Sequence, residues 1–237
     1  MRLSILIIAY NEERNIESCL KSVLNQTLKA DEIVIIAHNC TDQTEQLIKK
    51  YLTSAIKLIS YQGPAGQIFA RIKGFEEVSG DIIACLDGDS VAQPDWLKEL
   101  TEPFSDPTVV GTGGFITFTN SWLANLSSYN FFFWQKFYKP KNIFYFWGAN
   151  FACRLKTYQQ GSLKQLALIK DKIGLHYWAE DLFLALELKR FGKIIFTPKA
   201  RIKTVIKESK TKDSFKKSFW QTQDYSKLTK YFKTLSK

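Results

Sequence analysis

Short apolar segments alternate with amphipathic segments through the first part of the chain. Four of the apolar segments have the length and the β-branched content of buried strands. They are residues 3–9, 33–37, 56–60 and 82–86. A helix is predicted after each of these strands. Apolar residues at helical spacing follow the first strand, and Asp42 and Glu45 begin a helix after the second. Residues 66–78 are predicted to form a helix after the third strand, and Pro94 begins one after the fourth. The order βαβαβαβ predicts an α/β domain with a mostly parallel central sheet and helices on both faces.

The second part of the chain is less regular. Residues 109–147 are rich in Gly and aromatic side chains and predict no clear element, whereas 181–190 reads as an apolar helix and 193–196 as a strand. The Lys-rich stretch from Asp213 onward reads as another helix. Because ligands of parallel sheets bind beyond the carboxyl ends of the strands, the predicted ligand-binding loops are those after the four N-terminal strands. These loops follow Ala9, Ala37, Ser60 and Leu86.

The net charge of +10 is carried almost entirely by the C-terminal segment. From Lys199 onward, twelve Lys or Arg residues stand against three Asp or Glu, so nine of the ten net positive charges lie there. Such a segment suits an anionic surface, and anionic lipid, nucleic acid and solubility alone all stay open as explanations.

Zinc binding, export and membrane crossing are all disfavoured by the sequence. Cys19, Cys40, Cys85 and Cys153 show no paired spacing, and the chain has two histidines, so a zinc site of nitrogen and sulfur ligands is not expected. The N-terminal apolar run passes directly into charged residues, and no apolar stretch reaches the roughly 20 residues of a membrane helix. We expect a cytoplasmic protein without an export signal.

Asp87-Gly88-Asp89, a DXD motif, is the sharpest local signal because it directly follows an apolar strand. Alternate residues of an extended chain point to one side, so the two carboxylates can converge on one hard cation, and Gly88 lets a ligand approach the backbone. The motif predicts a Mg²⁺ or Mn²⁺ site completed by water and phosphate oxygens. The alternative is an acidic turn, since Asp and Gly are favoured in turns.

Five blocks of sequence, in this order, resemble family 2 glycosyltransferases with the A-type fold. They are SILIIAYNEERNIESCLKSVLNQT, DEIVIIAHNCTDQT, GPAGQIFARIKGFEEVSGDIIACLDGDS, WGANFACR and AEDLFLALELKRFGKIIFTPKARI. The resemblance implies a single-domain nucleotide-diphospho-sugar transferase (GT-A) fold. It implies a catalytic domain over 1–205, with a nucleotide-binding half at about 1–105 and an acceptor half at about 106–205, followed by a basic helical tail at 206–237.

The same resemblance implies an inverting enzyme that moves a sugar from a nucleotide-diphosphate donor, expected to be a UDP-sugar, to a hydroxyl of a glycan, a lipid-linked glycan or a lipid, in cell-envelope polysaccharide synthesis. The donor-binding residues that it implies are Ala9, Tyr10, Glu12, His38, Arg71 and Asp87, with Asp89 and Asp87 on the metal. Asp181 matches the family's general base, a role that a carboxylate within hydrogen-bond reach of the acceptor hydroxyl can perform. The alternative for Glu180 and Asp181 is a helix cap.

The implied acceptor-binding residues are Trp147, Gly148, Asn150 and Glu180. An indole face can stack on a sugar and an amide can bond its hydroxyls, although a buried structural Trp is an alternative.

Two positions depart from the family pattern. His38 stands where relatives often have an acidic residue that grips the nucleobase, so the base is open and an exposed loop histidine is the alternative. Ala9 replaces a proline that many relatives carry. Arg71 also has an alternative, as a surface residue of its helix, but near a helix N-terminus its guanidinium can pair with phosphate.

The stretch 121–147 is unusually aromatic and carries interleaved lysines. It suits a membrane interface, and packing under the sheet is an equal alternative. A peripheral position on the inner face of the membrane, through the basic tail, is therefore part of the prediction, whereas nucleic acid is not expected as a partner. Trp220-Gln221-Thr222-Gln223 does not match the Gln-x-x-Arg-Trp motif of relatives that build polymers, which favours a single transfer.

Rival functions explain less of the sequence. A nucleotidyltransferase would want a Gly-rich phosphate loop where this chain has Tyr10-Asn11-Glu12-Glu13, and a Rossmann oxidoreductase would want Gly-x-Gly-x-x-Gly there. A module that binds nucleic acid or membrane through its Lys-rich tail would leave the acidic pairs idle.

Overall fold

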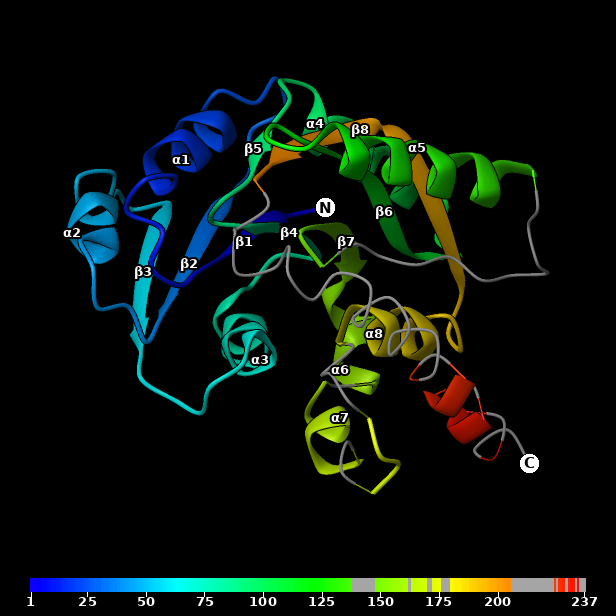
Figure 1. The fold of residues 1–237 in the computed structure, drawn as a ribbon. Helices are drawn as coiled ribbons and strands as arrows, with labels where there is room; N and C mark the ends of the chain where they lie inside the picture. Colours follow the sequence, from blue (N-terminus) through cyan, green and yellow to red (C-terminus); the bar gives the residue numbers. More distant parts are fainter. Residues whose placement is uncertain are drawn as a thin grey trace.

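The four strands predicted for the N-terminal half form one side of an eight-stranded sheet in the computed structural model (Figure 1). The structure describes residues 1–137, 148–161, 163–169, 172–175 and 180–205, and also 224, 226–228, 230–232 and 234. The predicted strands are confirmed as β1 (Leu3–Ala9), β2 (Glu32–His38), β3 (Ile56–Tyr61) and β4 (Ile82–Asp87). They pair in parallel in the order β3-β2-β1-β4, so their carboxyl ends lie along one edge.

The other side of the sheet contains two strands, the first and third of the four along the chain, that run antiparallel to their neighbours. Its strands are β5 (Val91–Ala92), β6 (Val109–Phe118), β7 (Asn150–Arg154) and β8 (Lys193–Thr204), and the sheet continues from β4 in the order β7-β6-β8-β5. β7 runs antiparallel to both β4 and β6, whereas β6 and β8 are parallel. The sheet is therefore mostly parallel, as predicted, but the strand predicted at 193–196 extends to Thr204, and no strand was predicted where β6 lies.

Glycines explain why β6 was missed. They interrupt the apolar pattern of VVGTGGFITF, yet the backbone needs at least one of them. A Cβ on Gly114 would lie 2.3 Å from the carbonyl oxygen of Ala200 and within 2.5 Å of the Asn150 amide. Close packing of β6 against β8 and β7 therefore requires a residue without a side chain at this position.

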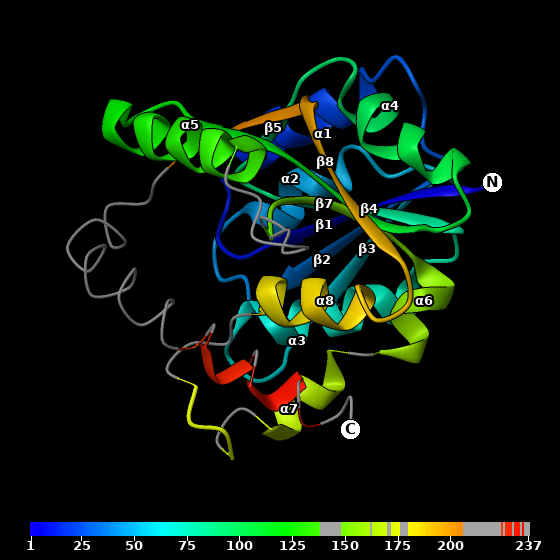
Figure 2. The same ribbon diagram turned by 90° about the vertical axis from the view of Figure 1, so that its right-hand side faces the viewer.

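Helices cover both faces of the sheet, as predicted. The helices are α1 (Ile16–Leu24), α2 (Thr44–Lys49), α3 (Gln67–Glu77), α4 (Trp96–Thr101) with a 3-10 turn at Glu102–Ser105, α5 (Trp122–Phe137), α6 (Leu155–Gln160), α7 (Lys164–Ile169) and α8 (Glu180–Leu188). In both views α1, α4 and α5 lie on one face, and α3, α6 and α8 lie on the other (Figures 1 and 2).

Each face of the sheet has its own buried core. One core joins α1 and α4 to the sheet, with Trp96 fully buried. The other core lies beneath α3 and α8 and includes Leu228 and Phe232 of the C-terminal segment. The Phe232 ring lies 5.4 Å from that of Phe183 in α8, so at least this part of the segment packs on the domain. The rest of 206–237, with the start of the predicted helix at Asp213, lies outside the described residues.

Among the described residues, no helix is both long and apolar enough to cross a membrane.

Candidate active site

The loops at the carboxyl ends of β1 and β2 are each pinned to the loop that follows the neighbouring strand. Asn11 and Asn39 adopt the left-handed conformation, at φ 52° and 51°, which Asn tolerates better than most residues. Asn11 Oδ1 accepts the N–H of Thr41 at 2.8 Å, and Asn39 exchanges two hydrogen bonds with the backbone of Gly63, at 2.9 and 3.0 Å. These bonds fix the edge at which the predicted ligand-binding loops meet.

The Asp87-Gly88-Asp89 turn packs directly against the end of β1. The Gly88 N–H donates to the carbonyl oxygen of Ile8 at 2.8 Å. A Cβ on Gly88 would lie 3.1 Å from that of Ala9 and 3.3 Å from Cγ of Glu12. Folding therefore brings together the two segments that were expected to hold the donor.

The residues expected to border the nucleotide differ in their surroundings. Glu12 is buried, its carboxylate accepts a hydrogen bond from Asn15 Nδ2 at 2.9 Å, and its N–H donates to Thr44 Oγ1 at 2.7 Å. Ala9 is buried at the end of β1, whereas Tyr10 is 57% exposed. Of these side chains, that of Tyr10 is the one open to solvent, where a nucleotide can reach its ring.

Arg71 is the centre of the site. It is 1% exposed, so the alternative of a surface arginine is wrong. Its Nη1 donates to the carbonyl oxygen of Gly148 at 2.9 Å, its Nη2 lies 3.5 Å from Asp87 Oδ1, and its guanidinium stands 5.3 Å from the centre of the Phe151 ring. Gln67, one turn earlier on α3, donates to the same Asp87 oxygen at 2.8 Å.

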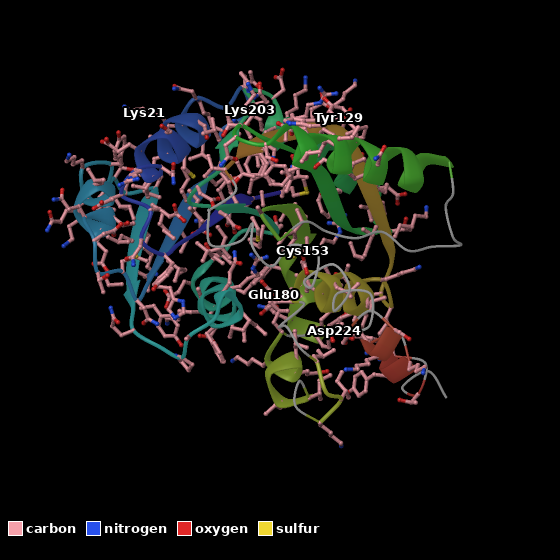
Figure 3. All side chains as sticks on the ribbon, in the orientation of Figure 1. Lys21, Tyr129, Cys153, Glu180, Lys203 and Asp224 are labelled. Carbon is pink, nitrogen blue, oxygen red and sulfur yellow. The ribbon has the colours of Figure 1, made fainter. Side chains whose placement is uncertain are left out.

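The acidic pair at the start of α8 faces the same guanidinium. Burial lowers the pKa of Arg71, but nearby carboxylates, first Asp87 and then Glu180 and Asp181, raise it above its ordinary value. Figure 3 shows Glu180 between α3 and α8, on the face of the sheet that carries Arg71. Arg71 Nε and Nη2 are buried without a hydrogen-bond acceptor in the described part of the chain. Charged N–H groups of this kind are suited to an anionic ligand.

Asp181 is partly buried, and its surroundings act in opposite directions on its carboxyl group. Burial raises the pKa of Asp181, while the N–H of Leu182 and the charge of Arg71 lower it, and the net shift is upward. The Leu182 N–H donates to Asp181 Oδ1 at 2.8 Å, within the first turn of α8. A carboxylate with a raised pKa binds a proton more readily than an ordinary aspartate does.

Asp89 is held at the end of β8. Its Oδ1 accepts hydrogen bonds from Thr204 Oγ1 at 3.1 Å and from Ser90 Oγ at 3.3 Å. Beneath the turn, burial and then the charges of Asp89, Asp87 and Glu12 raise the pKa of the Cys19 thiol, which keeps it neutral. The three carboxylates therefore lie close enough together to act on one buried group.

The turn is compatible with a hard divalent cation. Asp87 and Asp89 are both partly exposed and lie on alternate positions of the chain, and Mg²⁺ in proteins is commonly held by one or two carboxylates with water and phosphate completing its shell. Within the described ranges, no group of three or more His, Cys, Asp or Glu side chains is placed to hold a metal.

His38 is buried at the end of β2, so the alternative of an exposed loop histidine is wrong. Its ring stacks on Tyr61 at 5.3 Å. Burial lowers the pKa of His38, and the carbonyl groups of Pro64 and Gly63 partly offset this. Nε2 is buried and has no hydrogen-bond partner among the described residues.

The structure contradicts an acceptor-binding role for Asn150. The residue is fully buried, its Nδ2 donates to the carbonyl oxygens of Phe115 and Ala200 at 3.0 Å each, and its Oδ1 accepts the Trp96 indole N–H at 2.8 Å. Both N–H groups of the amide are therefore used to join β7 to β6 and β8, and its oxygen joins β7 to α4. The sequence motif showed that an Asn belongs here but not which way it points.

Gly148 contacts Arg71 rather than open space. Its carbonyl oxygen accepts the arginine's hydrogen bond, and a Cβ at this position would lie 3.3 Å from Nη1. Trp147 lies outside the described residues.

Two residues at the site were not predicted. Gln67 lies four positions before Arg71 on the same face of α3, which is a signal that helical spacing offers. Thr204 gave no such signal, because its contact with Asp89 depends on the unpredicted extension of β8.

Comparison with known proteins agrees with this geometry. A family model described as glycosyl transferase family 2 matches residues 4–161. Glycosyltransferase AglE of Haloferax volcanii is 31% identical over 121 residues, which are 49% of this chain and 40% of that protein. The glucosyl-dolichyl phosphate glucuronosyltransferase of the same organism is 28% identical over 58% of this chain and 44% of its own length. The chain thus spans less than half the length of these two relatives.

Solved structures share the fold. Mannosyltransferase PcManGT from Pyrobaculum calidifontis, in complex with GDP-Man and Mn²⁺, matches with a TM-score of 0.66 and 19% identity over 87% of this chain and 57% of that one. Glucosyl-3-phosphoglycerate synthase from Mycobacterium tuberculosis, with Mn²⁺, UDP and phosphoglyceric acid, matches with a TM-score of 0.65 and 14% identity over 98% of this chain and 78% of that one. The domain therefore has the GT-A fold.

Proposed function

The chain belongs to glycosyl transferase family 2, and from this premise we propose that it transfers a sugar from a nucleotide-diphosphate donor to a hydroxyl acceptor with inversion at the anomeric carbon. One observation carries the proposal: the buried guanidinium of Arg71 lies beside Asp87 and is also acted on by Glu180 and Asp181. Two acidic segments far apart in sequence thereby lie near one cation, and such a cation can meet a diphosphate.

The donor would lie along the carboxyl ends of β1, β2 and β4. Tyr10 is exposed to contact the nucleotide, and Arg71 offers two buried N–H groups to the diphosphate. Asp89, with Asp87, would hold Mg²⁺ or Mn²⁺, which when bound stabilises the negative charge on the departing diphosphate. Two of the structural neighbours contain Mn²⁺ together with a nucleotide or nucleotide sugar, which supports a divalent ion at this site.

His38 is the proposed contact for the base, and a UDP-sugar is the proposed donor. An imidazole nitrogen can accept a hydrogen bond, and the imide N–H of uracil is a matching donor. Guanine also carries a ring N–H, and one structural neighbour contains GDP-Man. Competition between UDP and GDP for the protein in the presence of Mn²⁺ distinguishes the two, and tighter UDP binding is the expected result.

Asp181 is the proposed general base. As the acceptor oxygen attacks the anomeric carbon, the bond to the diphosphate breaks and the hydroxyl proton passes to the Asp181 carboxylate. One displacement inverts the configuration, so a single base is sufficient. The upward shift of the Asp181 pKa supports this role, since it favours acceptance of the proton.

Replacing Asp181 with Asn tests the assignment. We expect turnover of a UDP-sugar, measured as UDP release with a lipid extract as the source of acceptor, to fall by at least about 100-fold, the lower end of the range for loss of a general base. Donor affinity should change little. Glu180→Gln, at the neighbouring acidic position, is the matched control and should retain more activity. An Asp181→Asn protein with full turnover would remove Asp181 from the mechanism.

A further inference from the structure

The first turns of α5 expose large apolar side chains to solvent. Trp122 is 74% exposed, Leu123 60% and Leu126 51%. Leu126 is four positions after Trp122 and three after Leu123, and positions three and four apart are neighbours on a helix, so these three side chains form one broad apolar stripe. Patches of this kind on soluble domains usually mark a contact surface.

Ring contacts and hydrogen bonds hold α5 to the sheet, and Ser128, on the side of the helix away from Trp122 and Leu126, is buried. The Tyr129 ring lies 5.2 Å from that of Phe115 in β6. Asn125 bonds the backbone of Phe118 twice, accepting its N–H at 2.6 Å and donating to its carbonyl oxygen at 2.8 Å. The helix is therefore anchored by one side while the apolar stripe is presented outward.

Exposed cations flank the stripe. Lys199, Arg201 and Lys203 alternate along β8 and are all exposed, and the Arg201 guanidinium lies 5.8 Å from the centre of the Phe115 ring beneath α5. The carbonyl oxygen of Thr204 accepts the N–H of Thr119, three residues before Trp122, at 2.9 Å. Figure 3 shows Lys203 and Tyr129 along the same side of the molecule.

We propose that the apolar stripe of α5 and the cations of β8 dock this protein on the interface of a bilayer that contains anionic lipid. Trp and Leu side chains of a surface helix enter the boundary between headgroups and acyl chains, and neighbouring Lys and Arg meet the lipid phosphates. A second copy of the chain fits this surface less well, because a symmetric contact would bring the same cations of both copies together. The net charge of +10 makes that repulsion stronger.

The docked surface lies next to the proposed metal site. Thr204, whose backbone is bonded beside the start of α5, also donates to Asp89 through its hydroxyl group. One consequence rests on the proposed function: a protein docked in this way would present its cleft to an acceptor hydroxyl on a molecule anchored in the same membrane.

Sedimentation with lipid vesicles tests the docking. The purified chain is mixed with vesicles of phosphatidylcholine and phosphatidylglycerol in equal parts, or with vesicles of phosphatidylcholine alone. We expect binding to the anionic vesicles that weakens in high salt, and a partition coefficient at least about tenfold lower for a variant combining Trp122→Ser and Leu123→Ser. Leu168→Ser removes an equally apolar side chain, 81% exposed on α7, and should bind as the wild type does.

Three results would overturn the proposal: no binding to anionic vesicles, equal binding of the double variant and the wild type, or self-association without vesicles that the double variant abolishes. The last result, seen by sedimentation velocity, would assign the stripe to a second copy. Titration of UDP with Mn²⁺ into the same proteins keeps the two questions apart. If the wild type does not bind UDP, this result would count against the proposed function and would leave the vesicle result unaffected.

Discussion

The surroundings of Asp181 suit catalysis but lower the stability of the folded protein when the carboxyl group is ionised. Burial raises the pKa of its carboxyl group, and the neighbouring Leu182 N–H and Arg71 offset only part of the shift. The ionised form that a general base needs is therefore the form that the folded protein disfavours. Proteins commonly lose some stability where a functional group is held in the form that activity requires.

This conflict predicts the pH dependence of stability. The folded-state pKa of Asp181 lies above that of an unfolded aspartate, which is about 3.9, so its stabilising contribution is fully present below that value and is lost as pH rises through the folded-state pKa. Asp181→Asn is therefore expected to have a higher free energy of unfolding than the wild type at neutral pH, and this difference should shrink in acid. Denaturant unfolding across this pH range measures it, and a variant less stable than the wild type at neutral pH would contradict it.

Some residues of the site could be predicted from the sequence, and others could not. Asp87, Asp89, Arg71 and Asp181 were all named from motifs, and the structure gathers them around one edge of the sheet. Asn150 was misassigned, because a motif identifies a residue type but not the direction of its side chain. Contacts such as that of Thr204 with Asp89 depend on the register of distant strands, which single-sequence patterns do not contain.

At the scale of elements, the regular half of the chain was predictable and the irregular half was not. β1, β2 and β4 are each marked by a short apolar run because both of their faces are buried, and the edge strand β3 has a similar run although it is partly exposed. β6 and the second part of β8 contain Gly, Pro and charged residues, and the two strands are paired with irregular register. Their structure follows from packing between segments rather than from local pattern.

Gly114 is the position where this packing is most easily tested. Because an added Cβ would meet the carbonyl oxygen of Ala200 and the buried Asn150 amide, Gly114→Ala is expected to lower the free energy of unfolding by about 2 kcal/mol or more, as overpacking of a core does. Gly88→Ala, whose Cβ would lie 3.1 Å from the nearest atom, is the milder comparison and should lose less. Denaturant unfolding of both variants measures the difference. Equal stabilities of Gly114→Ala and the wild type would show that β6 and β8 separate easily.

At the scale of the whole molecule, charge and fold divide the protein into regions of different character. The acidic groups of the proposed site, such as Asp87 beside Arg71, lie at the carboxyl edge of the sheet, whereas most of the net positive charge follows Lys199. The match to family 2 covers residues 4–161, and the structural neighbours share the architecture beyond that range. Both findings favour a glycosyltransferase over the nucleotidyltransferase and nucleic-acid alternatives.

The central claim is that separated acidic residues act in one cleft with distinct roles. Calorimetric titration of UDP in the presence and absence of Mn²⁺, into the wild type, Asp89→Asn and Asp181→Asn, tests it most directly. We expect Mn²⁺ to strengthen UDP binding to the wild type and to Asp181→Asn. In the presence of Mn²⁺, we expect Asp89→Asn to bind UDP about 10–100-fold more weakly than the wild type, as proteins with weakened metal sites do. An Asp89→Asn protein that retains the full effect of Mn²⁺ on UDP affinity would contradict the account.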